Sequence, residues 1–217
     1  ESGVAFFGAF LLTSHPFSPR GKFKPDEPFP PAPEGWVNFD PGIDTFDETP
    51  IDLRYLNEAV AGENGFIAVE GESFVQGLER RPIKFWAVNA GPAVVDMPRR
   101  YVDQLARFLA KRGVNLVRYH GPIYIQNGPD AGKIDQARLD NLFYFIAAMK
   151  REGVYTHLSI HFQHWLRLNE LQQFAGYDAQ TLPFAIHFFN PDFQRMYRSW
   201  WEALLTSRSP HIGRPLV

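Results

Sequence analysis

The stretch GVNLVRYH at residues 113–120 decides the fold. Gly113 suits the end of a preceding amphipathic helix, because glycine readily takes the left-handed conformation that closes a helix. The short apolar run that follows predicts a buried strand. This strand delivers Arg118, Tyr119 and His120 at its carboxyl end. A buried parallel strand with polar side chains at that end is the usual arrangement of an α/β-barrel active site.

The same pattern returns at residues 153–160, with the sequence GVYTHLSI. We therefore predict strands over 114–119 and 154–160, joined by a helix over 135–152. The inward face of that helix is expected to carry Leu139, Leu142, Phe143, Ile146 and Met149. The second strand leads directly into His161, Phe162, Gln163 and His164.

Further elements extend the pattern in both directions. Residues 82–89 (PIKFWAVN) predict one apolar strand that ends on Asn89, and residues 65–69 and 73–76 predict a hairpin. Residues 98–112 predict a helix. Its buried face is expected to hold Tyr101, Leu105, Phe108 and Leu109.

The last helix is expected to start at Asn190-Pro191, a capping residue followed by proline at the first helical position. A fourth strand would begin at 214–217. The resulting order, a hairpin and then β-α-β-α-β-α, implies a parallel sheet with right-handed crossovers. No strand is followed by a Gly-rich phosphate loop, so a (β/α) barrel is favoured over a nucleotide-binding open sheet.

The N-terminal part has a different character. Residues 15–35 are a Pro-rich arm whose prolines oppose regular structure, while its phenylalanines favour packing over disorder. Residues 4–12 are apolar but far shorter than the roughly 20 residues of a spanning helix. They also lack the basic flank of a signal peptide, so we expect a strand or packed segment. The predicted domains are a Pro/Phe-rich arm at 1–50 and a barrel part at 51–217.

Composition excludes several classes of function. The net charge is −2, without a basic block, so nucleic-acid binding has no electrostatic support. Aromatic residues make up 15% of the 217 residues, and aromatic rings without a basic surface favour a neutral partner such as a sugar. There is no cysteine, which excludes disulfides, thiolate metal sites and cysteine nucleophiles. We expect no cofactor and no membrane partner.

These motifs resemble a known family. A hairpin, the strand PIKFWAVN, the run GVNLVR at 113–118 and the strand that leads to His161 occur in this order in the N-terminal half of clan A glycoside hydrolases. The chain is most similar to the cellulase-like family five over residues 50–217. The resemblance implies an eight-stranded TIM barrel, of which the first three or so β/α units are present. It also implies an exported enzyme that cleaves β-linked polysaccharides with retention.

The resemblance assigns roles to individual residues. Arg118 matches the arginine that hydrogen-bonds the nucleophilic carboxylate, and a guanidinium there would keep the carboxylate ionised and oriented. His161 matches the histidine that lines the sugar subsite. His120 and Asn89 are expected as further subsite walls. Trp165 and Gln163 lie on the loop that often holds a sugar in this family.

Both catalytic glutamates of the family are missing. Retaining hydrolysis needs two carboxyl groups about 5–5.5 Å apart. The family carries them after strands four and seven, and neither Asn57-Glu58 nor Asn169-Glu170 lies at a barrel strand end. Three strands also cannot close a barrel. We therefore expect a fragment of a longer polypeptide that is inactive by itself.

Other interpretations remain open. A carbohydrate-binding pseudoenzyme could keep the cleft without the carboxylates, and a barrel of unrelated chemistry has the same fold. Arg118 could simply pair with a helix carboxylate, and His161 could be a core histidine. A metal site at His157, His161 and His164 is disfavoured, because residues four apart on a strand are separated by about 13 Å.

Overall fold

The computed structural model describes residues 4–7, 10–13, 34–36, 47, 49–168, 174 and 185–217. The chain divides into two compact units, Glu1–Asp47 and Glu48–Val217. In the first unit, strands β1 (Val4–Phe7) and β2 (Phe10–Thr13) pair antiparallel. The segment at 4–12 is therefore extended, as predicted, but it forms two short strands rather than one. The predicted Pro-rich arm lies outside the described residues, except for an exposed turn at its end.

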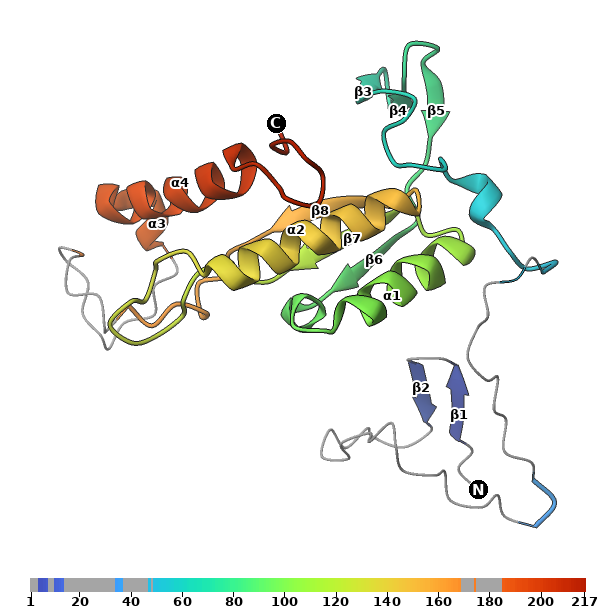
Figure 1. Ribbon diagram of the computed structural model, residues 1–217, viewed down its shortest axis with the longest axis horizontal. Helices are drawn as coiled ribbons and strands as arrows, with labels where there is room; N and C mark the ends of the chain where they lie inside the picture. Colours follow the sequence, from blue (N-terminus) through green and yellow to red (C-terminus); the bar gives the residue numbers. More distant parts are fainter. Residues whose placement is uncertain are drawn as a thin grey trace. The chain divides into compact units, whose positions relative to one another are not determined.

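The second unit is a mixed α/β structure built on a parallel sheet. Strands β6 (Ala87–Ala90), β7 (Leu116–His120) and β8 (Tyr155–Ser159) pair in that order, all parallel. Helices α1 (Arg99–Lys111) and α2 (Gln136–Arg151) connect them and lie side by side along one face of the sheet (Figure 1). The predicted β-α-β-α-β order is confirmed. The described residues form no closed barrel.

A second sheet precedes this one. Strands β3 (Ile67–Glu70) and β4 (Ser73–Gln76) form the predicted hairpin, and β5 (Arg81–Ile83) adds to β4 as a third antiparallel strand. Before it, η1 (Arg54–Leu56) is a short 3-10 turn. A further 3-10 turn, η2 (Pro92–Val95), joins β6 to α1.

The prediction of a single strand over 82–89 is wrong. That segment is divided between β5 and β6, which belong to different sheets. Asn115 explains the break, because its side chain accepts from the Trp86 amide at 2.8 Å and donates to the Lys84 carbonyl at 2.8 Å. Its own amide donates to the Trp86 carbonyl at 3.1 Å. The backbone of 84–86 is thus bonded to Asn115 rather than to a neighbouring strand.

The predicted face of α1 is wrong in part. Leu109 is buried as expected, but Tyr101 is 43% exposed and carries the Arg100 guanidinium over its ring. The apolar side chains that α1 buries are mostly small, namely Val102, Ala106, Leu109 and Ala110. Small side chains let the helix approach the sheet closely. The prediction of the buried face gave more weight to large apolar residues and therefore chose a different set.

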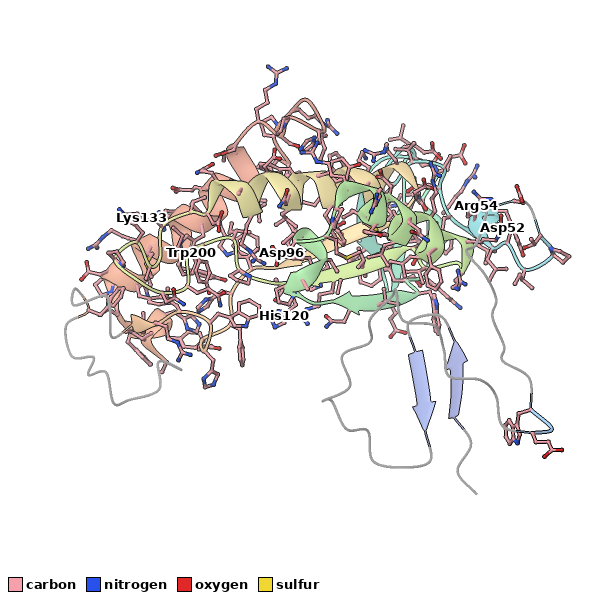
Figure 2. All side chains as sticks on the ribbon, turned by 60° about the horizontal axis from the view of Figure 1, so that its bottom comes forward. Asp52, Arg54, Asp96, His120, Lys133 and Trp200 are labelled. Atoms are coloured by element: carbon pink, nitrogen blue, oxygen red, sulfur yellow. The ribbon has the colours of Figure 1, made fainter. Side chains whose placement is uncertain are left out.

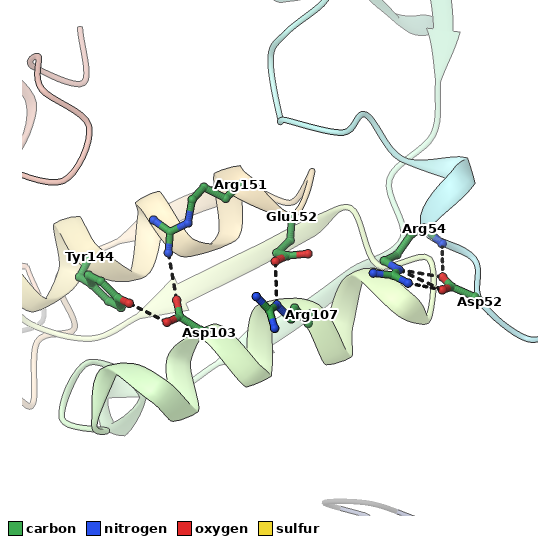
Figure 3. A network of polar contacts seen from close by, with 7 residues as sticks. All are labelled: Asp52, Arg54, Asp103, Arg107, Tyr144, Arg151 and Glu152. Atoms are coloured by element: carbon green, nitrogen blue, oxygen red, sulfur yellow. Dashed lines mark hydrogen bonds and ion pairs between the residues drawn. The ribbon is translucent and has the colours of Figure 1, made fainter. Parts of the chain in front are cut away.

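The inward face of α2 is confirmed. Leu139, Leu142, Phe143 and Met149 are buried, and Ile146 packs against the same core. Across the surface, polar contacts join α1 and α2 (Figure 3). Asp103 accepts from the Tyr144 hydroxyl at 2.7 Å and from Arg151 at 2.9 Å. These exposed pairs add little stability individually, so the apolar layer between helices and sheet is the main source of cohesion.

The last helix forms as predicted. In α4 (Pro191–Thr206), the Asn190 side chain accepts from the amides of Asp192 and Phe193, and Pro191 occupies the first helical position. A short helix, α3 (Ile186–Phe189), leads into it. The buried side chains of α4 are Phe193, Trp200 and Leu204.

The end of the chain differs from the prediction. Residues 214–217 form no strand; the amides of Leu216 and Val217 donate to the Leu205 carbonyl instead and turn the chain back onto α4. Within the described part of the chain, no helix is both long and apolar enough to cross a lipid bilayer.

Candidate functional site

The carboxyl end of β7 carries two polar side chains on the face of the sheet that α1 and α2 leave uncovered. Side chains alternate along a strand, so Val117 and Tyr119 point toward the helices and are fully buried, while Arg118 and His120 point away and are half-buried. Register places Asn89 of β6 beside Arg118, and Ser159 of β8 beside His120. His120 is labelled in Figure 2.

These four side chains form one hydrogen-bonded group, the strand-end cluster of Asn89, Arg118, His120 and Ser159. Arg118 Nη1 donates to Asn89 Oδ1 at 2.9 Å. Arg118 Nη2 lies 3.0 Å from Ser159 Oγ and 3.1 Å from His120 Nδ1. Ser159 Oγ and His120 Nδ1 are 2.9 Å apart. Two predicted site residues, Asn89 and His120, thus lie in direct contact with Arg118.

The charge of Arg118 has no carboxylate partner among the described residues. Its three hydrogen-bond partners are an amide oxygen, a hydroxyl and an imidazole nitrogen, all neutral. Among the described residues, Arg118 therefore does not pair with a helix carboxylate, which was one of the open interpretations. A half-buried guanidinium held by neutral acceptors retains its attraction for an anionic group placed nearby.

The environment of His120 favours its neutral form. Burial lowers the pKa of the imidazole, and the positive charge of Arg118 lowers it further, against a smaller opposing effect of the Ser159 backbone carbonyl. A neutral imidazole beside the guanidinium also agrees with the short Arg118 Nη2–His120 Nδ1 contact, because a guanidinium can only donate.

Aromatic rings lie next to the cluster. The Trp165 ring is 4.7 Å from His120, and Phe162 lies 6.2 Å from His120 and 5.8 Å from Trp165, measured between centroids. Gln126 fixes this loop, since its side chain donates to the Trp165 carbonyl at 3.1 Å and its own carbonyl accepts from the Arg167 amide at 2.8 Å. Trp165 thus lies next to the strand-end cluster.

His161 is not part of the strand-end cluster. Its Nδ1 is 2.8 Å from the Tyr124 hydroxyl, and its ring packs against aromatic rings of α4, including Trp200 at 5.5 Å. Burial, and to a lesser degree the neighbouring His187, lower the pKa of His161 to about 4. Its Nε2 is buried and unpartnered in the described residues. The structure therefore places His161 in an aromatic pocket under α4, beyond the end of β8.

The remaining predicted residues add less to the site. Gln163 is half-buried and makes no hydrogen bond to a described residue. His157 lies opposite Arg118 in the register, but its side chain is exposed. No group of three or more potential metal ligands occurs within the described ranges.

Ser159 was missed by the sequence interpretation. It lies within the run GVYTHLSI, where nothing distinguishes the serine from an ordinary strand residue. Aligning the two repeated Gly-Val patterns pairs His120 with Ile160, whereas the register of the sheet pairs it with Ser159, so the repeat in the sequence does not identify this serine.

A separate pocket of about 670 Å³ opens near the amino ends of β7 and β8, with Asp52, Arg54, Glu58 and Glu152 in its lining. Its acidic groups are engaged in structure. Arg54 donates hydrogen bonds to Asp52 (Figure 3), and these lower the pKa of Asp52 to about 2. Glu58 accepts from the Tyr155 hydroxyl at 2.5 Å.

Comparison with known proteins gives one fold-level match. No family model matches the chain, and no curated protein matches it either. Among solved structures, the endo-1,4-beta-mannanase from Rhizomucor miehei aligns with a TM-score of 0.54 and 12% sequence identity. The alignment covers 70% of this chain and 44% of the mannanase chain. The likeness is one of fold. This chain thus corresponds to less than half the length of the mannanase, and its strands and helices are arranged like those of part of that structure.

Proposed function

We propose that this chain forms the first three β/α units of a TIM-barrel glycoside hydrolase that cleaves β-linked polysaccharides with retention. In this proposal β6, β7 and β8 are the first three barrel strands. The face that carries Arg118 is then the inside of the barrel, and the strand-end cluster lies at the catalytic end, where the active sites of such barrels are found.

One observation supports this proposal most strongly. Arg118 stands at the carboxyl end of a parallel strand, half-buried, and its described partners are all neutral. A guanidinium so placed suits the orientation of a carboxylate nucleophile, which barrel strands beyond these three would carry. The aromatic rings of Trp165 and Phe162 next to it are the kind of surface on which sugar rings pack.

The mannanase likeness suggests the first substrates to test. We propose β-1,4-linked mannan, with β-1,4-glucan as the second choice because the sequence resembles cellulase-like enzymes. The same resemblance is the basis for proposing an extracellular or periplasmic location. His120, Asn89, Trp165 and Gln163 remain the proposed sugar-contacting residues. His161 is no longer proposed as one, because its Nδ1 contacts the Tyr124 hydroxyl and its Nε2 is buried.

On this chain the function is tested by binding. Mannotetraose and cellotetraose are titrated against the protein while tryptophan fluorescence and amide chemical shifts are recorded. We expect Trp165→Ala to weaken binding by about tenfold through loss of aromatic contact. Trp86→Ala is the matched control, because Trp86 is 67% exposed and lies at the opposite end of β6. Saturable binding that is unaffected by Trp165→Ala would contradict the proposed site.

In a polypeptide with the complete barrel, hydrolysis of mannan is the decisive measurement. Arg118→Ala should lower turnover by about 100-fold or more, because the nucleophile loses its positioning charge. Arg99→Ala is the control, since Arg99 is an exposed arginine that pairs with Asp140. Unchanged turnover in Arg118→Ala with a native circular dichroism spectrum would refute the role of Arg118.

A non-catalytic carbohydrate-binding protein is the second candidate. It is favoured by the lack of any carboxylate within ion-pair distance of Arg118 in the described residues. The two candidates differ in the sequence that encodes the later strands. An Asn-Glu pair after a fourth strand and a glutamate after a seventh support the hydrolase, and their absence supports the binding protein.

A further inference from the structure

The strand-end cluster contains an imidazole nitrogen, His120 Nε2, that makes no hydrogen bond to a described residue. His120 makes its hydrogen bonds through Nδ1, to Arg118 and Ser159. Its Nε2 has no partner among the described residues and is not one of the buried unpartnered atoms. His120 Nε2 is therefore accessible on the uncovered face of the sheet, beside Trp165.

Hydrogen-bond chemistry decides which nitrogen carries the proton. Arg118 Nη2 can only donate, so the 3.1 Å contact requires a lone pair on His120 Nδ1. Ser159 Oγ already accepts from Arg118 Nη2 at 3.0 Å, which leaves its hydrogen free to point at Nδ1 at 2.9 Å. Two donors directed at Nδ1 favour the neutral ring that carries its proton on Nε2.

We propose that Ser159, together with Arg118, is a positioning residue that holds His120 as the Nε2–H tautomer, so that His120 donates a hydrogen bond to a hydroxyl or ring oxygen of a bound sugar. The identity of the ligand as a sugar rests on the proposed function, whereas the tautomer of His120 rests only on the contacts within the protein. A neutral donor next to an aromatic ring suits an uncharged sugar better than a phosphate or carboxylate, which would prefer the guanidinium.

The surroundings agree with a neutral ring. From β7, Arg118 is the charged group that contacts His120, and Asn89 of β6 is neutral. From β8, the Ser159 side chain is neutral, and the Ser159 backbone carbonyl raises the pKa of His120 by less than burial and Arg118 lower it. The loop contributes the rings of Phe162 and Trp165. No described carboxylate is in ion-pair contact with His120 to stabilise an imidazolium. The cluster therefore presents a fixed N–H at neutral pH.

The test begins with the unmodified chain and requires no sugar. Nitrogen-15 spectra of the histidine side chains at pH 7 report the tautomer directly, and His120→Gln assigns the resonances. We expect His120 Nδ1 to resonate as an unprotonated nitrogen and Nε2 as a protonated one. A Nδ1–H tautomer, or a charged ring at pH 7, would overturn the inference whatever the function of the protein is.

Two variants then test Ser159. Ser159→Ala should move the His120 nitrogen shifts toward those of a ring that exchanges between tautomers, and Ser159→Thr, which keeps the hydroxyl, should restore the original shifts. Identical shifts in Ser159→Ala and in the unmodified chain would show that Ser159 has no positioning role. Amide spectra of each variant establish that β8 is still folded.

The sugar contact is tested separately with mannotetraose. We expect its addition to shift His120 Nε2, and we expect His120→Phe, which keeps a ring but has no donor, to weaken binding by about fivefold to tenfold. Binding that leaves Nε2 and the His120→Phe affinity unchanged contradicts the donor role. If no oligosaccharide binds at all, the proposed function fails, while the tautomer measurement still decides the protein part of the inference.

Discussion

Asn115 shows how one side chain can organise two strands. It is buried with 9% of its surface exposed, and it bonds the backbone on both sides of Phe85. Its carbonyl also accepts from the Tyr155 amide at 2.9 Å, which links the start of β8 to the residue before β7. The asparagine of the GVNLVR run is therefore a structural residue, although the resemblance to glycoside hydrolases first drew attention to that run as a whole.

This role predicts the cost of removing the side chain. Asn115→Ala leaves a buried amide and a buried carbonyl unpaired, so the free energy of unfolding should fall by about 2–3 kcal/mol. Urea titration followed by circular dichroism measures the change. Asn127→Ala, an exposed asparagine in a loop, is the control and should change stability by less than about 0.5 kcal/mol. Equal stability of the two variants would contradict the bridging role of Asn115.

Glu58 predicts a dependence of stability on pH. Burial opposes the charge of this carboxylate, but hydrogen bonds from the Tyr155 hydroxyl and from the amides of Gly62 and Asn64 outweigh it and lower its pKa below 4.5. A carboxylate with a lowered folded-state pKa stabilises the protein above its unfolded pKa and loses that contribution as the pH falls through the folded value.

The measurement compares melting temperatures of the unmodified chain and Glu58→Gln between pH 7 and pH 3. The variant should melt at a lower temperature at pH 7, and the difference should shrink below about pH 4.5, where the carboxylate becomes protonated. Glu72→Gln, an exposed turn residue, should show no such trend. A difference between the unmodified chain and Glu58→Gln that is constant across this range would refute the argument.

At the scale of the element, the turn from α2 into β8 depends on Gly153. Its φ of 74° lies in the left-handed region, and an added Cβ would collide with the Glu58 carbonyl oxygen. Gly128 has a similar φ of 79° but open space around it. The two glycines therefore separate the cost of the backbone conformation from the cost of the collision.

We predict different stabilities for the two alanine variants. Gly128→Ala should cost about 1–2 kcal/mol, the penalty of a left-handed conformation for a residue with a Cβ. Gly153→Ala should cost more than about 4 kcal/mol, because backbone of the 57–64 loop must also move. Denaturant titration of both variants measures the difference. Equal costs would show that the loop yields easily, and that its contact with β8 contributes little to stability.

Sequence reasoning succeeded where one local rule decided the element. The start of α4 follows from its cap at Asn190, and the positions of α2, β7 and β8 follow from their apolar patterns. It failed where a distant residue decided. The break between β5 and β6 is caused by Asn115, about thirty residues later, and no pattern within 82–89 reports it.

The candidate site was predictable to the same degree. Strand alternation places Asn89, Arg118 and His120 on one face, so their grouping follows from the predicted strands. The position of His161 does not, because it comes after the end of β8 and is directed by Tyr124 and by rings of α4. Only the packed structure shows that His161 occupies an aromatic pocket rather than the strand-end cluster.

At the scale of the whole unit from Glu48 to Val217, the core is unevenly distributed. The buried residues gather between the parallel sheet and the helices α1, α2 and α4, where Val117 and Trp200 are fully buried. In the sheet β3–β4–β5, only Val75 is buried, and the neighbouring Phe66 and Leu78 are 96% and 100% exposed. Stability should follow the same distribution, because local opening is easiest where few apolar contacts must be broken.

Hydrogen exchange should therefore divide the unit into two classes of amide. Strand β7, with a paired neighbour on each side, should contain the slowest amides, at least about 100-fold slower than those of β4, which is also the central strand of its sheet. Using two central strands removes the difference between edge and centre from the comparison. Exchange measured by mass spectrometry or NMR at pH 7 tests this expectation. Equal protection of β4 and β7 would contradict this expectation. It would mean that the antiparallel sheet has stabilising contacts beyond those described for its exposed side chains, and that the two sheets unfold together as one cooperative unit.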